Sequence, residues 1–312
     1  MTPTLPATTS RKLTNKEFHV LADVPPELEW FANLTNAKTR RAYKNDIQEF
    51  SQFVGLAKPQ DMRSVTRAHV IAWRKELEAR ELAPSTIRRK LSALASLFDH
   101  LCESNAVTHN PVSGVERPKL GTNEGLTPAI SDKQARDLLE GPDEKTMKGK
   151  RDRAILATLL YHGIRREEVA NLKVKDVELR KGVPHLRIFG KGNKIRHIPL
   201  HPQAGRLIDE YLEEAEHGIE AKGPLFRPVT NNVTGKLSKA LHPDSIYHAI
   251  VKPYGGIGVH SLRATAATNA LDHQSDIAEV QKWLGHANIS TTRLYDRRKS
   301  RPEDSPTFRV KY

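Results

Sequence analysis

A break in the apolar pattern divides this chain and limits what it can fold into. Between Arg117 and Pro128 the regular spacing of apolar residues stops, and prolines and glycines accumulate. The 312 residues are enough for two domains that each bury a core. We therefore predict an N-terminal extension over residues 1–25, a first domain over 26–117, a linker over 118–128 and a second domain over 129–312.

The first domain is predicted to consist of helices. Thr66 and Ser85 stand where each can cap a helix, because a hydroxyl oxygen accepts a hydrogen bond from a first-turn backbone N–H. Apolar residues at helical spacing mark the buried faces: Tyr43, Ile47, Phe50 and Val54; Val70, Trp73 and Leu77; and Ile87, Leu91, Leu94, Phe98 and Leu101. We therefore expect these stripes to form the core.

The second domain changes its periodicity partway along. Ser131 and Gln134 form a capping-box pattern, and a further helix runs from about Asp152 to Gly163, followed by a short one. Three short segments separated by glycines then alternate as antiparallel strands do: residues 174–179, 186–188 and 195–200. Helices resume over residues 202–216. The predicted fold class is mainly α, with a helical first domain and a mixed α+β second domain that holds a small antiparallel sheet.

The charge of the chain indicates a polyanionic partner. Its 50 lysines and arginines outnumber 37 aspartates and glutamates, and the formal net charge is +13. Such a protein gains affinity for nucleic acid by releasing counterions from the phosphate backbone, although an anionic membrane surface is the competing interpretation. We find no run of about 18 apolar residues and no secretion signal in residues 1–10, so we expect a cytoplasmic protein. The single cysteine, Cys102, excludes an intramolecular disulfide and a cysteine-rich zinc site.

Basic residues on the polar faces of the first domain are candidate DNA contacts. For any one of them a solvated surface position without a ligand is the simpler interpretation. As a group on a small helical domain they could follow a phosphate backbone. They are Arg40, Arg41, Lys44, Arg88, Arg89 and Lys90.

Three cations in the second domain could act on a phosphate, and each has a structural alternative. Arg165 follows a glycine at a helix junction, where a ligand could be held, but it could instead only pair with Glu168. Lys191 and Lys194 lie on a glycine-flanked turn. They could enter a DNA groove or simply keep a hairpin tip soluble.

A histidine, arginine, histidine and tyrosine follow near the end of the chain. His260 and Arg263 are three residues apart, so a helix would place both on one face, where they can meet one phosphate. His286 follows a glycine that ends a helix, a common place for a histidine without a ligand. Tyr295 could be presented by a short helix capped by Ser290, or it could be a half-buried core residue.

In their order and spacing, these motifs resemble those of the tyrosine recombinase (phage integrase) family. The motifs are Gly163-Ile164-Arg165, Gly190-Lys191-Gly192-Asn193-Lys194, His260-Ser261-Leu262-Arg263, Leu284-Gly285-His286 and Tyr295. The resemblance covers about residues 26–300, and its motifs are highly specific. It implies a helical core-binding (SAM-like) domain and a mainly helical catalytic domain with a small sheet, which close as a clamp on duplex DNA.

The resemblance implies a site-specific recombinase that cleaves and rejoins DNA through a 3′-phosphotyrosyl intermediate. Tyr295 matches the nucleophile and His260 the base that it needs, because an ordinary tyrosine hydroxyl ionises only near ~10. Arg165 and Arg263 match the pair that binds the non-bridging phosphate oxygens, and His286 matches a further hydrogen-bond donor.

The remaining positions are matched less uniquely. Lys191 resembles the general acid that protonates the departing 5′-oxygen, with Lys194 as its nearest rival and otherwise a DNA contact. Glu168 matches an acidic residue that supports the site, although Glu167 could compete for that role. Arg166 is a departure, because the family often has a small apolar residue there, and so is Ala264-Thr265-Ala266, where many relatives carry a histidine and an aromatic residue.

The resemblance also implies the partners of such an enzyme. No metal or cofactor is expected, because the arginines and the lysine supply the positive charge at the phosphate. The expected partner is double-stranded DNA with paired recombination half-sites, on which the protein forms dimers and tetramers, with an accessory or partner recombinase as a further possibility. A two-domain recombinase of the Xer or transposon-resolvase kind, bacterial or phage-encoded and nucleoid-associated, fits this pattern.

Three other functions compete with recombination. One is a type IB-like DNA topoisomerase, disfavoured because the chain follows the recombinase domain order. Another is a non-catalytic DNA-binding protein on the same scaffold, disfavoured because every catalytic position is filled. A metal-dependent nuclease is the weakest, because its four candidate ligands have no recognisable spacing. These ligands are His162, His260, His273 and His286.

Overall fold

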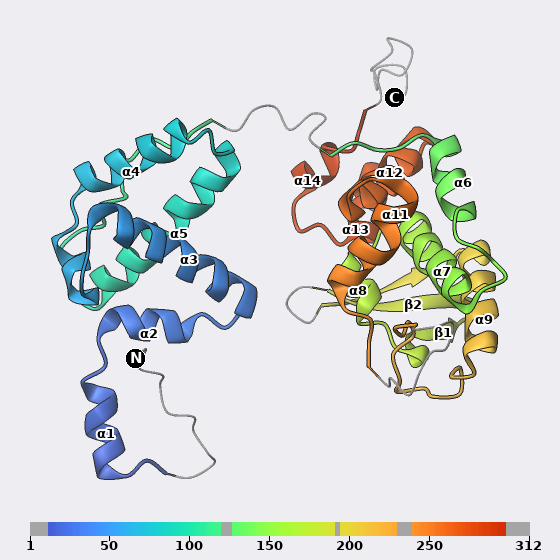
Figure 1. The fold of residues 1–312 in the computed structure, drawn as a ribbon, viewed down its shortest axis with the longest axis horizontal. Helices are drawn as coiled ribbons and strands as arrows, with labels where there is room; N and C mark the ends of the chain where they lie inside the picture. The colour runs from blue at the N-terminus through green and yellow to red at the C-terminus, as the bar shows by residue number, and fades with distance from the viewer. Residues whose placement is uncertain (1–11, 120–126, 191–193, 230–238, 298–312) are drawn as a thin grey trace, which may run out of the picture. The chain divides into compact units, whose positions relative to one another are not determined.

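The chain forms two compact units, residues 1–122 and 123–312 (Figure 1). The computed structural model describes residues 12–119, 127–190, 194–229 and 239–297. Within these ranges no helix is both long and apolar enough to cross a membrane. Each unit has its own hydrophobic core.

The first unit contains only helices in its described residues, as the apolar stripes predict. They are α1 (Asn15–Ala22), α2 (Pro26–Asn33), α3 (Ala37–Val54), the 3-10 helix η1 (Pro59–Ser64), α4 (Arg67–Ala79) and α5 (Pro84–Glu103). Helices α3, α4 and α5 pack around a core in which Phe50, Trp73 and Phe98 are fully buried. The ring of Phe50 meets that of Trp73 edge to face, with centroids 5.0 Å apart.

One helix start in this unit differs from the sequence interpretation. Thr66 is the N-cap residue of α4, as expected. Ser85 is not a cap, because α5 begins one residue earlier at Pro84 with Ala83 in the N-cap position. A proline suits the first helical position, since its fixed φ fits a helix and its missing N–H would have no partner there.

The second unit combines helices with one small sheet. Its helices are α6 (Asp132–Glu140), α7 (Met147–His162), α8 (Arg166–Ala170), the 3-10 helix η2 (Val174–Asp176), α9 (Pro202–Ala215), α10 (Pro243–Ser245), the π-helix η4 (Ile246–Val251), α11 (Lys252–Gly255), α12 (Val259–Asp272), α13 (Ile277–Leu284) and α14 (Ile289–Arg293). Helix α7 is buried on nearly all sides and packs against both α9 and α12 (Figure 1).

The sheet is antiparallel, with strand order β1-β2-β3. Its strands are β1 (Val177–Arg180), β2 (Val183–Phe189) and β3 (Ile195–Pro199). Alternation directs Leu186, Ile188 and Ile198 into the core of the unit. The mainly α fold with a small antiparallel sheet is confirmed, although residues 174–176, predicted as the start of the first strand, form the 3-10 helix η2 instead.

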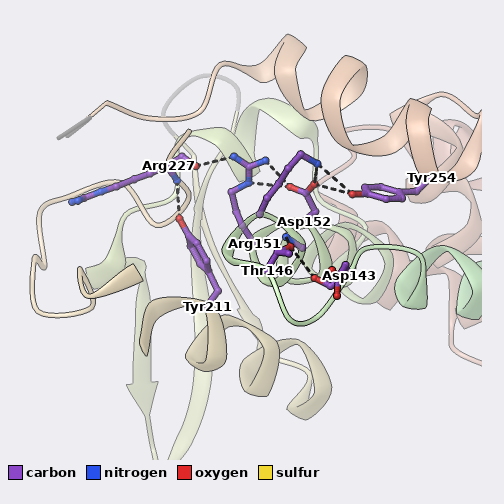
Figure 2. Close-up of polar contacts among 9 residues, drawn as sticks. Asp143, Thr146, Arg151, Asp152, Tyr211, Arg227 and Tyr254 are labelled. Carbon is purple, nitrogen blue, oxygen red and sulfur yellow. Dashed lines mark hydrogen bonds and ion pairs between the residues drawn. The ribbon is translucent and has the colours of Figure 1, made fainter. Parts of the chain in front are cut away.

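A polar network fixes the start of α7 inside the second unit (Figure 2). Asp152 is fully buried, and one of its oxygens accepts hydrogen bonds from Nε and Nη2 of Arg151 at 2.9 and 2.7 Å. Its other oxygen accepts from Lys148 at 2.7 Å and from the Tyr254 hydroxyl at 3.4 Å. Nη1 of Arg151 donates to the carbonyl of Arg227 at 3.2 Å. The buried carboxylate therefore has four donors, which offset its desolvation.

Candidate active site

Five of the predicted site residues come from separate elements of the second unit and lie close together. Arg165 is the N-cap residue of α8, and His260 and Arg263 lie in the first turns of α12. His286 follows the glycine that ends α13, and Tyr295 lies two residues after α14. Helices α8 and α12 begin, and helices α13 and α14 end, in the same part of the second unit. The side chains at these four helix ends therefore lie close together.

Tyr295 and His260 form the central contact. The Tyr295 hydroxyl lies 3.2 Å from Nε2 of His260. The tyrosine is only 5% exposed, and its ring belongs to an apolar cluster with Ala264 and Leu284, while Thr268 donates to its carbonyl oxygen at 3.2 Å. The phenolic oxygen is therefore held beside a nitrogen that can accept its proton.

The start of α14 differs from the sequence interpretation. Asn288, not Ser290, is the N-cap residue, and its side-chain oxygen accepts from the Ser290 N–H at 2.9 Å. Asparagine suits this position because its short carbonyl reaches the first-turn N–H groups.

The surroundings of His260 favour the neutral imidazole. Burial lowers the pKa of His260, and the positive charges of Arg263 and Arg165 lower that pKa further. A neutral imidazole at neutral pH has an unprotonated nitrogen, so it can act as a base.

Arg263 is held almost entirely by its neighbours. It is 2% exposed, its Nη1 donates to the carbonyl of Gly163, and its Nη2 donates to the carbonyl of Leu284 at 2.7 Å. Gly163 has φ +56°, and a Cβ there would lie 2.8 Å from a Leu284 methyl group, so a glycine is required to end α7 and to expose this carbonyl. The Nε of Arg263 is buried without a hydrogen-bond partner among the described residues.

His286 holds the same guanidinium. Nη2 of Arg263 lies 2.8 Å from Nε2 of His286, and Nδ1 of His286 lies 3.0 Å from the hydroxyl of Thr292. Because a guanidinium can only donate, Nε2 accepts, and the ring proton is assigned to Nδ1. Burial, followed by the charges of Arg263 and Arg165, lowers the pKa of His286 to about 4. In this arrangement His286 orients Arg263 and has no N–H directed at a phosphate.

Arg165 and Glu168 are joined by a third residue, Arg196. Nη1 of Arg165 donates to Oε1 of Glu168 at 3.0 Å, and the Arg165 backbone N–H donates to Oε2 at 2.8 Å. Nη1 and Nη2 of Arg196 donate to the same two oxygens at 3.0 and 2.8 Å. Burial acts to raise the pKa of Glu168, but the bonds from Arg196 and Arg165 outweigh it, so this pKa lies below its usual value. Glu168 is therefore a carboxylate.

Sequence reasoning missed Arg196 and Thr292. Arg196 had a local signal, since it lies two residues before Ile198 on an alternating strand and so shares the inward face of β3. Thr292 had none, because a hydroxyl three residues before the tyrosine is ordinary in a short helix. It became visible only through its contact with His286.

Arg165, His260 and Arg263 line one cleft of about 470 Å³, together with Tyr247 of the π-helix. The side chain of Arg165 is 43% exposed, so its guanidinium reaches the solvent side of this cleft. Arg166 also lines this cleft and pairs with Asp244 at 3.0 Å, so the charged residue at this position has a counterion.

The hairpin lysines lie at the edge of what the structure describes. Lys191 lies outside the described residues. Lys194 is exposed, and its carbonyl oxygen accepts from the Gly190 N–H at 2.8 Å, which closes the base of the β2–β3 hairpin.

The basic residues of the first unit are not equivalent. Arg41 and Lys44 are exposed, whereas Nζ of Lys90 is buried and lies 3.2 Å from Asp46. The carboxylates of Asp46 and Glu49 enclose its ammonium, so Lys90 is the least exposed of these residues and its DNA contact stays a prediction. Arg89 also pairs with Asp46 but remains 44% exposed.

Two further arginines of this unit bond to backbone carbonyls. Arg40 donates to the carbonyl of Leu34, next to the end of α2, and Arg88 donates to that of Pro118 at 3.3 Å. Both bonds fix chain segments within the unit and leave part of each guanidinium for other contacts.

The histidines of the nuclease alternative do not come together. His162 is 1% exposed, with Nδ1 directed at the carbonyl of Thr158 and Nε2 accepting from the His201 N–H at 3.0 Å. Nδ1 of His273 lies 2.8 Å from the carbonyl of Asn269. In the described part of the chain no three such side chains are placed to hold a metal ion.

Known proteins match both units. The phage integrase family matches residues 128–301, and the N-terminal SAM-like domain of phage integrases matches residues 31–105. Tyrosine recombinase XerC of Pelobacter propionicus is 34% identical over 258 residues, which are 82% of this chain and 83% of that protein.

Two solved structures share the fold. XerH site-specific recombinase bound to a palindromic difH substrate has a TM-score of 0.66 at 20% identity and covers 90% of this chain and 84% of its own. A lambda integrase dimer bound to a COC′ core site has a TM-score of 0.66 at 15% identity and covers 89% and 96%. The family match over residues 128–301 and the 34% identity to XerC show that the chain belongs to the phage integrase family of tyrosine recombinases, enzymes that break and rejoin DNA.

Proposed function

We propose that this recombinase cleaves each DNA strand at a specific site by attack of Tyr295 on a phosphodiester, which leaves a 3′-phosphotyrosyl bond. The observation that carries the proposal is the 3.2 Å contact between the Tyr295 hydroxyl and Nε2 of His260, at a cleft that Arg165 and Arg263 also line. The proposed nucleophile, its proposed base and two cations thus lie close together, which supports this chemistry.

Proton transfer accompanies the attack. As the Tyr295 oxygen forms its bond to phosphorus, its proton passes to Nε2 of His260, which the lowered pKa of His260 keeps unprotonated beforehand. The bond from phosphorus to the 5′-oxygen breaks, and that oxygen takes a proton from Lys191, the proposed general acid. Reversal of these steps with a different 5′-hydroxyl rejoins the strand.

Charge on the non-bridging oxygens grows in the transition state, and two guanidiniums are proposed to stabilise it. Arg165 offers its exposed donors, and Arg263 offers the Nε–H that has no partner in the described protein. A donor fixed in advance contributes about 10²- to 10³-fold to such reactions. Glu168 and His286 would keep the two arginines in place, because each bonds to one of them.

Double-stranded DNA with paired half-sites is the proposed substrate, bound by a dimer that assembles into a tetramer, and an accessory or partner recombinase is a further proposed partner. The lambda integrase relative is a dimer on its core site, which supports this assembly.

In the first unit, Arg41 and Lys44 are proposed as phosphate contacts because both are exposed. Replacing Lys44 by alanine should reduce the slope of log K against log salt concentration by about 1, which a filter-binding series would measure.

A covalent-trapping experiment tests the chemistry. The wild-type protein, incubated with a nicked suicide duplex that carries its site, should form a protein–DNA adduct that survives denaturation. Tyr295→Phe should bind the same duplex and form none, since it lacks the attacking oxygen. Tyr247→Phe, at the same cleft, is the matched control and should keep the adduct. An adduct in Tyr295→Phe would refute the assignment.

A further inference from the structure

Arg196 connects three elements that carry site residues. From strand β3 its Nη1 and Nη2 grip both oxygens of Glu168, at 3.0 and 2.8 Å. Its Nε donates to the carbonyl of Trp283 at 3.3 Å, in the last turn of α13. Its side chain is 15% exposed, so the guanidinium lies mostly inside the unit. One side chain therefore joins β3, the start of α8 and the end of α13.

Each end of this contact lies next to a residue of the proposed chemistry. Glu168 bonds to both the guanidinium and the backbone N–H of Arg165. Trp283 stands three residues before His286, and a Cβ on the intervening Gly285 would lie 3.4 Å from Arg196 atoms. The turn that presents His286 therefore packs directly on the Arg196 side chain. On the other side, Nη1 of Arg196 would lie 3.4 Å from a Cβ at Gly190, where the β2–β3 hairpin begins.

We assign the Arg196 guanidinium no contact with the substrate, because its side chain is 15% exposed and each of its nitrogens already donates to the protein. A guanidinium has five N–H donors, and here both of its terminal nitrogens and Nε are bonded to protein groups. A lysine could not reproduce this contact, since an ammonium is a point charge without the planar fork that binds two carboxylate oxygens and a carbonyl together.

We propose that Arg196 is a positioning residue for strand cleavage, which fixes Arg165, through Glu168, and the turn of His286 relative to one another. This inference rests on the function proposed above. Displacement of a catalytic group by about 1 Å can cost about a hundredfold in rate, so loss of the Arg196 contacts should slow cleavage without removing any group that touches DNA.

The same sheet offers a matched control. Nε and Nη2 of Arg187 on β2 donate to one oxygen of Asp176 at 3.0 and 2.6 Å, and Asp176 is 1% exposed. Arg187 thus also neutralises a buried carboxylate, but it bonds to no site residue. Arg196→Met and Arg187→Met should therefore cost similar amounts of stability and differ in their effect on cleavage.

The experiment compares wild type, Arg196→Met, Arg196→Lys and Arg187→Met on the suicide duplex. Three quantities are measured: the thermal midpoint, the equilibrium affinity for the duplex and the single-turnover rate of adduct formation. We expect Arg196→Met to cleave at least about tenfold more slowly than Arg187→Met, with an affinity within about twofold of wild type. Arg196→Lys, which keeps the charge, should recover only part of the rate and serves in place of Arg196→Met if that variant does not fold.

Several outcomes would overturn the inference. It fails if Arg196→Met and Arg196→Lys cleave as fast as Arg187→Met, or if rate and affinity fall together, since a purely structural role would produce that. Wild type provides the distinction from the proposed function. If wild type forms no adduct, the proposed function fails and this inference with it, whereas a normal wild-type adduct with unaffected Arg196 variants removes this inference alone.

Discussion

Two buried carboxylates in the second unit hold cations in similar ways but in different surroundings. Asp152 forms ion pairs with Arg151 and Lys148, and Glu168 forms ion pairs with Arg165 and Arg196. Around Asp152 the Arg151 side chain is only 4% exposed and all three of its guanidinium nitrogens donate to protein groups, while the fourth bond to the carboxylate comes from a tyrosine (Figure 2). Near Glu168 lies a third guanidinium, that of Arg263, whose charge interacts with those of Glu168 and Arg165. Among the described residues, Arg263 bonds to carbonyl oxygens and an imidazole but to no carboxylate.

The difference separates a structural ion-pair network from a binding site. A cation enclosed by acceptors of its own protein has no capacity left for a ligand. Arg263 keeps a buried Nε–H without a partner in the described residues, and Arg165 keeps an exposed guanidinium. A buried donor without an acceptor costs free energy, so we propose that a phosphate oxygen completes the site at Arg263.

The largest expected effect is on folding, at Asp152. Asp152→Ala removes the acceptor that Arg151, Lys148 and Tyr254 share, and leaves the Arg151 guanidinium buried and without its counterion. Breaking a buried pair from one side costs about 3–5 kcal/mol. Urea unfolding of the second unit should show a loss of this size. A loss below about 1 kcal/mol would mean that the two networks do not differ in the way we infer.

The next effect is on catalysis, at Arg263. In Arg263→Lys a single ammonium cannot bond to Gly163, Leu284 and His286 and also meet a phosphate, so adduct formation should slow by about a hundredfold. Single-turnover trapping measures this. Arg151→Lys is the matched comparison and should lower the thermal midpoint while the rate per folded molecule stays near that of wild type. Equal rates for the two lysine variants would remove the distinction between the networks.

Local patterns in the sequence predicted the helices and strands that carry both networks, but not which side chains bond to one another. Gly163 and Gly285 do end α7 and α13 in the left-handed conformation, and the period-two segment does form the sheet. These features depend on neighbours within a few residues. The helix α1 was not predicted, although Thr14 and Glu17 form a complete capping box at its start. None of its residues is buried, so it has no buried apolar stripe of the kind that marked the other helices.

Contacts between distant residues explain the other differences. Lys90 lies on α5 beside Arg88 and Arg89, and the sequence gives no sign that it differs from them. Its ammonium is nevertheless enclosed by Asp46, which lies 44 residues earlier in the chain. Arg196 meets Glu168 across 28 residues and Trp283 across 87. Periodicity identifies the face of an element and not its partner, so the order of the candidate site residues, with Glu168 among them, was visible in the sequence while the contacts of Arg196 and Thr292 were not.

The smallest expected effect is on the pH dependence of cleavage, and it contrasts a histidine of the site with one of the core. Burial lowers the pKa of both His260 and His162, that of His162 to about 4, but only His260 also faces Arg263 and Arg165. Protonation removes the base, so the rate falls as pH falls through the pKa of His260. Because that pKa lies below 6.5, the rate should fall less than about twofold between pH 8 and pH 6.5.

The stability of the folded protein must be measured at each pH of the same series, because protonation of His162 destabilises the fold as the pH falls. Its folded pKa lies below the unfolded value of 6.5, so the unfolded chain binds the extra proton and the folded state loses stability as pH falls from about 6.5 toward about 4. Single-turnover rates should therefore be scaled by the folded fraction from circular dichroism at each pH. A scaled rate whose midpoint lies at or above pH 6.5 would show that His260 is an ordinary histidine, and that the guanidiniums beside it do not govern its charge.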